Sequence, residues 1–193
     1  MNGHDKGGAA PGREELQKVF DEADCLADEA KVERAIARVA TEITRDFGDR
    51  LPVVLCVVKG GIVFGGKLLT ALHFPLDFDY VHATRYNNTT RGSGLVWKVP
   101  PSIPLAGRHV LVVDDILDVG ATLDAIAASC REQGALSVAT AVLVDKRHER
   151  KARPGMRADY TGLDIADRYL FGYGMDYEGY WRNAPGIYAV KGL

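Results

Sequence analysis

The sequence predicts an α/β fold in which a mostly parallel, twisted sheet is flanked by helices. Three apolar runs, at 53–58, 109–113 and 137–144, are rich in Val and Leu, as are strands that are buried on both faces. Segments with helical spacing of apolar residues lie before and between these runs. Strands that alternate with helices form a parallel sheet with helices on both faces. A chain of 193 residues is long enough for one such domain.

The segment before the first strand is predicted to be a tail followed by helices. Residues 1–12 are polar and rich in Gly, which is typical of a flexible tail. A weak helical pattern covers 13–25, and a stronger one ends at Gly48, a natural stop for a helix. The apolar positions of the stronger helix are spaced by three or four residues: Val32, Ala35, Ile36, Val39, Ala40, Ile43 and Phe47.

From residue 50 onward, strand and helix patterns alternate. In order, the predicted elements are a strand at 53–58, a helix at 62–72, strands at 76–85, 95–99 and 109–113, a helix at 122–133 and a strand at 137–144. The polar segment 87–94 is predicted to be a mobile loop. Ligands of such sheets bind at the carboxyl ends of the strands. Polar, Gly-containing segments follow Val58 and Val113, so we expect the site there.

The charge balance argues against an extended surface for nucleic acid or an anionic membrane. The chain has 24 basic and 26 acidic residues and a formal charge of −2. An anionic substrate must therefore be bound by local groups such as helix N-termini, loop amides and metal ions. No apolar run approaches the roughly 20 residues that span a bilayer, and the first residues contain no apolar signal core.

The cysteines indicate a reducing compartment. Cys25, Cys56 and Cys130 are odd in number and widely spaced, which argues against a disulfide framework or a zinc site. A reducing environment fits this usage best. We therefore expect a cytoplasmic protein that binds neither nucleic acid nor a membrane.

The most informative segment follows the strand at 109–113. Residues 110–123 read Val-Leu-Val-Val-Asp-Asp-Ile-Leu-Asp-Val-Gly-Ala-Thr-Leu. The N-terminus of the following helix offers free amides and a partial positive charge, which suit a phosphate. Gly120 lets the backbone approach a ligand closely, and Thr122 can both cap the helix and donate to a phosphate oxygen. Asp114 and Asp115 would repel a phosphate unless they hold sugar hydroxyls with Mg²⁺ nearby.

Three other interpretations of this segment are weaker. Phosphoacceptor signalling domains also have an Asp pair after a strand, but there the pair opens the chain, and here it lies past the midpoint. A Walker-B strand also ends in acids, but the sequence has no Gly-x-x-x-x-Gly-Lys-[Ser/Thr] loop to match it. A purely structural turn does not require the compound pattern of two acids followed by Asp-x-Gly-x-Thr.

The segment resembles the phosphoribosyl-pyrophosphate signature of type I phosphoribosyltransferases. From about residue 50 onward, the chain resembles one branch of them, the hypoxanthine-guanine phosphoribosyltransferases. Val58-Lys59-Gly60-Gly61 matches the pyrophosphate-binding loop of that family, and Lys146 matches its base-recognising lysine. Residues 167–177 match its purine-binding segment, and Arg182 follows at the expected distance. Four matches in the right order are far more specific than any one alone.

The resemblance implies roles for residues around the phosphoribosyl group. Asp114 and Asp115 would bind the ribose hydroxyls, directly or through Mg²⁺. Lys59 and Gly60 would present backbone amides to pyrophosphate, at a peptide that is often cis without proline in this family. Arg182 would pair with pyrophosphate oxygens. The residues that would wrap the 5′-phosphate are Asp118, Val119, Gly120, Ala121 and Thr122.

The resemblance also implies which residues recognise the base. Lys146 would donate to the purine 6-oxygen, Tyr169 would stack on the ring, and the backbone of Leu170 would read its edge. Asp118 would lie near N7 and act as its proton acceptor or hydrogen-bond partner, which makes it the expected catalytic residue. Asp176, in the purine-binding segment, would hold a second Mg²⁺, so the expected metal ligands are Asp114, Asp115 and Asp176.

Two positions depart from the family pattern. The closing loop usually carries Ser-Tyr, whereas this sequence has Arg85-Tyr86. Tyr86 keeps the closing role, and the contact made at Arg85 is left open. Ala121 replaces a lysine of some members, so no charge is supplied to the phosphate there. The segment around 84–95 would close over the site and exclude water.

The implied architecture is the type I phosphoribosyltransferase fold, with a small hood formed by the N- and C-terminal segments. After the tail at 1–12, residues 13–193 would form a single domain. Its core would cover about 50–165, and its hood would combine 13–50 with 165–193. A homodimer or homotetramer is expected, because such assemblies are common in these families.

The implied activity is purine salvage. The enzyme would transfer the 5-phosphoribosyl group from phosphoribosyl pyrophosphate to hypoxanthine or guanine, with Mg²⁺ as cofactor, and release pyrophosphate. One alternative is a transferase that prefers xanthine, which shares the 6-oxygen; adenine is disfavoured because Lys146 would face an amino donor. Another is a non-catalytic regulator that binds phosphoribosyl pyrophosphate, which the presence of Lys59, Asp118 and Arg182 disfavours.

Overall fold

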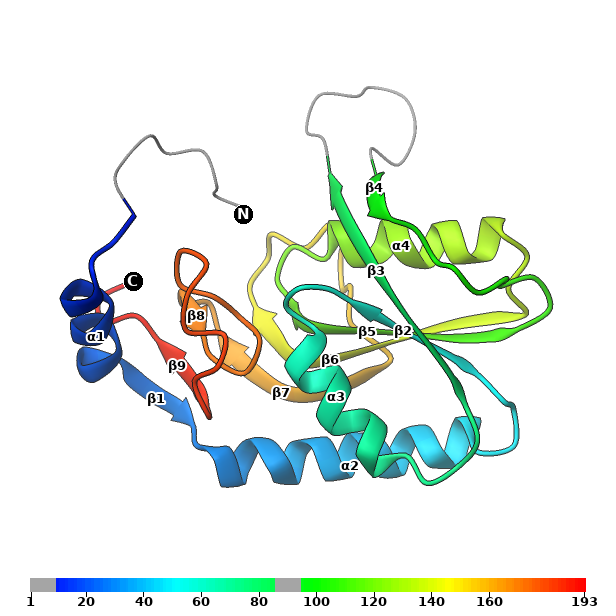
Figure 1. Cartoon of the computed structure of the whole chain (residues 1–193), viewed down its shortest axis with the longest axis horizontal. Coiled ribbons are helices and arrows are strands. Elements are labelled where there is room, and N and C mark those ends of the chain that lie inside the picture. The colour runs from blue at the N-terminus through cyan, green and yellow to red at the C-terminus, as the bar shows by residue number, and fades with distance from the viewer. Residues whose placement is uncertain (1–9, 86–94) are drawn as a thin grey trace.

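The structure, a computed structural model, describes residues 10–85 and 95–193, without the side chain of Arg85. Within these residues, six strands form the central sheet in the order β4-β3-β2-β5-β6-β7 (Figure 1). All neighbouring pairs are parallel except β3 and β4, at one edge. The strands are β2 (Val53–Val57), β3 (Asp77–Arg85), β4 (Leu95–Val99), β5 (His109–Leu117), β6 (Ser137–Arg147) and β7 (Tyr160–Ala166). The predicted fold class is confirmed.

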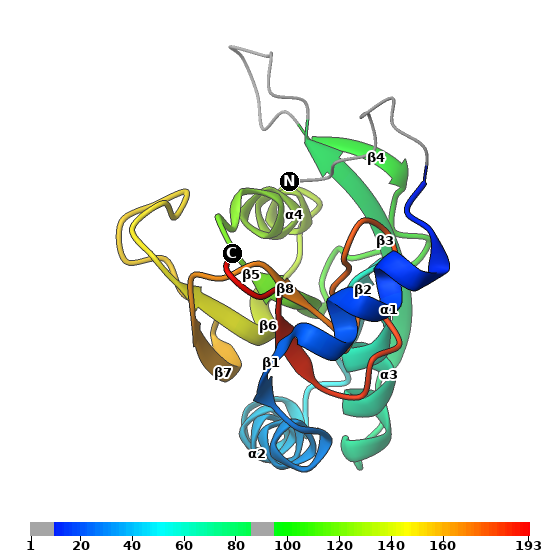
Figure 2. The same ribbon diagram turned by 90° about the vertical axis from the view of Figure 1, so that its left-hand side faces the viewer.

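Helices cover both faces of this sheet. α2 (Glu29–Phe47) and α3 (Ile62–Ala71) lie on one face, and α4 (Ala121–Glu132) lies on the other (Figures 1 and 2). α2 begins after Asp28, whose carboxylate accepts a hydrogen bond from the N–H of Lys31 at 2.8 Å. No helix in the described part of the chain is long and apolar enough to cross a membrane.

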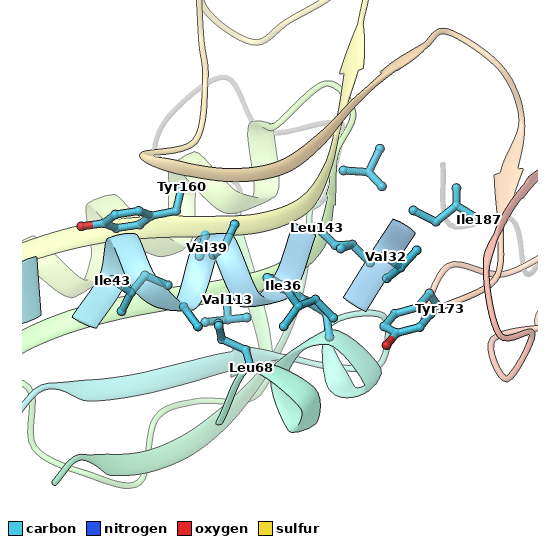
Figure 3. Close-up of a cluster of buried hydrophobic side chains, with 14 of the residues drawn as sticks. Val32, Ile36, Val39, Ile43, Leu68, Val113, Leu143, Tyr160, Tyr173 and Ile187 are labelled. Atoms are coloured by element: carbon cyan, nitrogen blue, oxygen red, sulfur yellow. The ribbon is translucent and has the colours of Figure 1, made fainter. Parts of the chain in front are cut away.

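Alternate side chains of the strands point into two hydrophobic cores. The core that faces α2 and α3 includes Val32, Ile36, Val39, Ile43, Leu68, Leu111 and Val113 (Figure 3). The core that faces α4 includes Val53, Leu55, Val112, Leu123 and Ile126. Each fully buried aliphatic side chain stabilises the fold by about 1.5–3 kcal/mol. The carboxyl ends of β2, β5 and β6 are therefore anchored from both faces.

A second, smaller sheet joins segments from opposite ends of the described chain. β1 (Asp24–Ala27), β9 (Ile187–Ala189) and β8 (Leu170–Phe171) pair antiparallel in the order β1-β9-β8. Figure 2 views the molecule from the side on which this end sheet lies. α1 (Arg13–Glu22) packs beside it through Phe20, whose ring stacks on that of Trp181 with 4.8 Å between centroids.

One polar contact ties the end sheet region to the central layers. The hydroxyl of Tyr173 donates to the carboxylate of Glu33 in α2 at 2.6 Å. The same carboxylate accepts from the ammonium of Lys67 in α3 at 2.8 Å. The position of the segment after β8 is therefore set partly by a hydrogen bond to α2, whose carboxylate also binds α3.

The structure differs from the predicted elements in three places. β5 extends to Leu117 because it pairs with β6 through Asp145, and β6 extends to Arg147 because it pairs with β7 through Ala166, after the apolar runs end. The helix predicted over 13–25 ends at Glu22, since Ala23 is extended and Cys25 lies in β1. β7, β8 and β9 are not predicted by the apolar pattern, because β7 is interrupted by Gly162 and Asp164 and the other two are very short.

Candidate active site

The two acids near the end of β5 are packed side by side. Asp115 is 7% exposed and Asp114 is half-buried, and the N–H of Asp115 donates to Oδ1 of Asp114 at 2.9 Å. Burial raises the pKa of both carboxyls, and the adjacent charge of Asp115 raises the pKa of Asp114 further. Among the described residues, neither carboxylate has an ion-pair partner. Two carboxylates in this arrangement can bind a cation or accept hydrogen bonds from hydroxyl groups.

Glycines allow two other segments to approach this acid pair. A Cβ at Gly60 would overlap the carboxylate of Asp115. Gly174, with φ of +106°, lies so close to the carbonyl of Gly60 that a Cβ there would also overlap it. The peptide between Val58 and Lys59 is cis, as the resemblance implies. The loop after β2 and the segment after β8 therefore meet at Asp115.

The turn after β5 leads directly into α4. Gly120 is the N-terminal cap of α4, with φ of +82°, a left-handed conformation that favours glycine. The prediction that Thr122 caps the helix is wrong, because Thr122 is already the second residue of α4. Its hydroxyl is therefore not needed as a cap. The first amides of a helix have no partner within the helix, so they face the space beside this turn.

Lys146 is buried at the end of β6 between two carboxylates. Its Nζ lies 3.2 Å from Asp167 and 3.6 Å from Asp118, and its side chain is 11% exposed. Arg150 binds Asp167 through two hydrogen bonds of 2.6 and 3.1 Å. Arg150 first, and Lys146 second, hold the pKa of Asp167 well below its usual value. Lys146 is thus a buried cation and not an exposed member of a basic run.

Asp118 also contacts a histidine. His148 Nε2 lies 2.7 Å from Oδ1 of Asp118, so Asp118 is flanked by an imidazole and an ammonium. Asp118 is not the cap of α4, since Gly120 holds that position. Asp118 is 38% exposed at its side chain, which leaves it accessible to a ligand.

The purine-binding segment expected at 167–177 follows the end of β7. Tyr169 is 42% exposed, and its ring meets that of Tyr177 edge-on with 5.7 Å between centroids. Leu170 is buried in β8. The ring of Trp181 packs on Phe20 of α1.

Asp176 and Arg182 are paired with each other. The Arg182 guanidinium lies 2.5 Å from Asp176 and donates to the carbonyl of Gly174 at 2.6 Å. Asp176 also accepts from the N–H of Gly179 at 2.7 Å. Because Gly174 lies against Asp115, the Arg182 guanidinium bound to it is near the acid pair, and its charge partly offsets the effect of burial on the pKa of Asp115.

The structure brings most of the expected site residues together, but not as one metal cluster. Asp114, Asp115 and Asp176 do not gather within ligand distance of a single ion. In the described ranges, the only group of three acidic, Cys or His side chains at that spacing is Asp118, His148 and Asp167. Two expected residues cannot be placed: Tyr86 and the side chain of Arg85 lie outside the described residues, as does the loop predicted at 87–94.

The sequence pattern does not identify four further residues near the site. Lys151 Nζ donates to the carbonyls of Leu117 and Asp118 at 2.7 and 2.8 Å and to the fully buried Asp145 at 2.8 Å. This ammonium therefore links the start of the turn after β5 to the end of β6. The residues missed are Asp145, His148, Arg150 and Lys151. Their position at the carboxyl end of β6 was the available signal, since ligands gather at that edge.

Comparisons with known proteins agree with this geometry. Residues 22–178 match the model of the phosphoribosyl transferase domain. The hypoxanthine-guanine phosphoribosyltransferase of Bacillus subtilis (strain 168) is 30% identical over 86% of this chain and 92% of its own length. The hypoxanthine-guanine-xanthine phosphoribosyltransferase of Tritrichomonas foetus is 32% identical over 86% of this chain and 90% of its own.

Solved structures give the same result. A hypoxanthine-guanine-xanthine phosphoribosyltransferase superposes with a TM-score of 0.80 at 30% identity, over 89% of this chain and 99% of that one. The hypoxanthine phosphoribosyl transferase of Trypanosoma cruzi superposes with a TM-score of 0.79 at 27% identity, over 87% of this chain and 91% of that one. The chain therefore has the type I phosphoribosyltransferase fold and belongs to the phosphoribosyltransferase family, in its hypoxanthine-guanine branch.

Proposed function

We propose that the protein transfers the 5-phosphoribosyl group of phosphoribosyl pyrophosphate to hypoxanthine or guanine, giving IMP or GMP and pyrophosphate. The observation that carries this proposal is the pair of Asp114 and Asp115 beside the turn at Gly120, where α4 begins. The acids can hold sugar hydroxyls while the helix N-terminus holds a phosphate. The names of the Bacillus subtilis and Tritrichomonas foetus relatives both include these two bases.

The acid pair fits a Mg²⁺ ion. Carboxylate oxygens are preferred ligands of this ion. Burial raises the pKa of both carboxyls, and the charge of Asp115 raises that of Asp114 further, so a divalent cation would stabilise their charged forms. We propose that Asp114 and Asp115 hold one ion near the ribose hydroxyls and that Asp176 holds a second. Mg²⁺, when bound, neutralises charge on the leaving pyrophosphate.

The phosphate groups are proposed to bind on either side of the acid pair. The amides of residues 118–122 would hold the 5′-phosphate, with a further hydrogen bond from the hydroxyl of Thr122. The amides of Lys59 and Gly60 and the guanidinium of Arg182 would hold pyrophosphate. Arg182 is already oriented by Gly174 and Asp176, which supports this role. Arg85 and Tyr86 are proposed to close over these groups.

The base is proposed to bind between Lys146 and Tyr169. Lys146 would donate to the 6-oxygen, and the exposed ring of Tyr169 would stack on the purine. The backbone of Leu170 would read the edge of the base. Because Lys146 is held between Asp118 and Asp167, its ammonium has a fixed position from which to select an acceptor at carbon 6.

In the proposed reaction, N9 of the purine displaces pyrophosphate at the anomeric carbon of the ribose. The transition state has cation character at that carbon, and positioning and electrostatics supply most of the rate increase. Asp118 accepts or shares the N7 proton as N9 attacks. Water has to be excluded, because it would hydrolyse the activated sugar.

The proposal extends to assembly and location. We propose a homodimer or homotetramer in the cytoplasm, with residues 13–193 acting as one domain made of a core at about 50–165 and a hood from 13–50 and 165–193. The pairing of β1 with β9 supports a hood built from both segments. For the Trypanosoma cruzi relative, the C-terminal region has a role in oligomeric state and enzymatic activity.

A base panel tests the proposal directly. The protein is incubated with phosphoribosyl pyrophosphate, Mg²⁺ and one of hypoxanthine, guanine, xanthine or adenine, and the mononucleotide is detected. We expect product from hypoxanthine and guanine and none from adenine. No product from either 6-oxopurine, with folded protein, would refute the proposal. A higher kcat/KM for xanthine would favour the second candidate, which the Tritrichomonas foetus relative suggests.

A further inference from the structure

His148 has no role in the reaction as described so far, although it touches Asp118. Its side chain is 4% exposed, and Nε2 lies 2.7 Å from Oδ1 of Asp118. On the other side of the ring, Nδ1 accepts a hydrogen bond of 3.0 Å from the backbone N–H of Arg150. The imidazole therefore has a partner at each nitrogen.

These two contacts define the tautomer of the ring. A nitrogen that accepts a hydrogen bond from a backbone N–H carries no proton, so Nδ1 is the acceptor and the ring proton lies on Nε2. Nε2 then donates to the carboxylate of Asp118. The N–H of Arg150 thus sets the direction of the hydrogen bond between His148 and Asp118.

The second oxygen of Asp118 contacts Lys146, which Asp118 shares with Asp167. Lys146 lies 3.6 Å from Oδ2 of Asp118 and 3.2 Å from Asp167, and in the proposed function it also donates to the purine 6-oxygen. A base that recruits this ammonium leaves Asp118 with His148 as its remaining described partner. The orientation of Asp118 in the complex then depends on His148.

We propose that His148 is a positioning residue that fixes the carboxylate of Asp118 toward purine N7. This inference rests on the proposed function, in which Asp118 receives or shares the N7 proton. The imidazole is nearly buried and has a hydrogen-bond partner at each nitrogen, so its orientation is fixed. Through these hydrogen bonds the segment after β6 aligns a side chain of the turn after β5.

A metal site is the other arrangement that these residues suggest, and the contacts argue against it. Asp118, His148 and Asp167 have donor atoms within 4.8 Å of one another. However, the ammonium of Lys146 lies between the two carboxylates, and Nε2 of His148 carries the proton that a metal would have to replace. The group is therefore complete without an ion.

Two variants separate positioning from a merely structural role. His148→Ala removes the donor, whereas His148→Gln keeps an N–H near the place of Nε2. With phosphoribosyl pyrophosphate, hypoxanthine and Mg²⁺, we expect kcat of the Ala variant to fall about 10- to 100-fold, the size expected for losing a hydrogen bond to a charged group. Both KM values should stay within about twofold, and the Gln variant should recover most of the rate.

His109→Ala is the matched control. His109 Nδ1 also contacts a side chain, Ser137 Oγ at 2.8 Å, but at the beginning of β5, away from the site. Its kcat should equal that of the unchanged protein, and thermal denaturation confirms that all three variants fold. A wild-type kcat in His148→Ala would overturn the inference. Equal losses in folded Ala and Gln variants would also overturn it, because they would mean that the shape of the ring matters and its hydrogen bond to Asp118 does not.

The tautomer provides a readout that does not need activity. Nitrogen-15 NMR of the histidine side chains distinguishes a proton on Nε2 from one on Nδ1. We expect the Nε2–H form for His148, and an Nδ1–H form would overturn the inference. If the unchanged protein shows the Nε2–H form but converts no base, the proposed function fails while the contact with Asp118 stands.

Discussion

Residues 114–122 and residues 169–182 meet at the same site but are held there by different interactions. The first segment begins in β5, whose side chains are buried in two hydrophobic cores. Lys151 donates hydrogen bonds to the carbonyls of Leu117 and Asp118, where its turn begins. The second segment contains the two-residue strand β8 and has positive φ at Tyr173 and Trp181. Leu170, Tyr173 and Met175 contribute to the core that faces α2 and α3, but little of this segment is paired backbone. The hydrogen bond to Glu33 and the pair of Asp176 and Arg182 also hold it.

This contrast suggests a division of labour. In the proposed function, the acids that act on the sugar and the reacting atoms need fixed geometry, and they lie on the segment that continues a long, paired strand. The groups proposed to cover the base lie on the segment with little backbone pairing, where opening and closing cost less. Changes in residues 114–122 should therefore lower kcat, and changes in residues 169–182 should act mainly on substrate binding.

The largest expected effect comes from removing the metal, because both segments contribute acids. Treatment with excess chelator should abolish product formation, and added Mg²⁺ should restore it, since Asp114, Asp115 and Asp176 then have a cation to share with the polyanionic ligands. The measurement is the rate of mononucleotide formation before and after chelation. Full activity in excess chelator would contradict the proposed metal role on both sides of the site.

Asp118→Asn tests whether a change in residues 114–122 lowers kcat without weakening substrate binding. Asn keeps the shape and a hydrogen-bonding group but loses basicity, so kcat should fall about 10²–10⁴-fold, the range typical of a general base. The KM for phosphoribosyl pyrophosphate should change little, because backbone amides and Thr122 hold the 5′-phosphate in the proposal. Steady-state kinetics in both substrates measure this. A rate close to that of the unchanged protein would remove Asp118 from the chemistry.

Lys146→Ala tests whether a residue of the anchored sheet can serve base recognition. We expect a rise of at least about tenfold in KM for hypoxanthine, the size of a lost charge-assisted hydrogen bond, and a smaller change for phosphoribosyl pyrophosphate. Binding of each substrate by titration calorimetry provides the comparison. Equal losses for the two substrates would mean that Lys146 does not read the base.

Tyr173→Phe should give the smallest effect and act only on the second segment. The variant loses the hydrogen bond to Glu33, which is partly exposed, so we expect a stability loss of about 0.5–1.5 kcal/mol and a few-fold rise in KM for the base. Urea denaturation and kinetics measure the two quantities. A lower kcat with an unchanged KM would break the proposed division between the segments.

The same contact has a defined pH dependence. Hydrogen bonds from Lys67 first, and from Tyr173 second, lower the pKa of Glu33. A lowered carboxyl pKa stabilises the folded state above the ordinary value of 4.5 and loses this effect as the pH falls through the lowered value. The stability difference between the unchanged protein and Tyr173→Phe should therefore shrink in acid. A constant difference from pH 7 to 3 would exclude this linkage.

The anchored half of the site is predictable from sequence, and the other half is less so. The run 110–113, the acids after it and Gly120 predict a strand, a buried edge and a tight turn because each depends on local pattern. The contact of Gly174 with Gly60 and the pairing of β1 with β9 join residues far apart in the chain, and no local pattern reports them. Resemblance identified the segment at 167–177, but not how it is held.

The contact of His148 with Asp118 shows a second reason why part of the site is not predictable from sequence. The apolar run of β6 ends at Val144, and the strand predicted from it ends there too, whereas the strand continues to Arg147. Three more paired residues, Asp145, Lys146 and Arg147, carry His148 to the edge beside Asp118. Hydrophobic pattern reports where side chains are buried, not where backbone pairing stops.

The order of strands in the end sheet has a consequence for synthesis on the ribosome. The central sheet has all its strands once β7 has emerged, so the acid pair and the turn at Gly120 can form in a growing chain. The end sheet cannot, because β9 is its middle strand and is the last element to emerge. The nascent protein would therefore acquire a phosphate-binding edge before it acquires the stacking face for the base, and substrate selectivity would be the final property to mature.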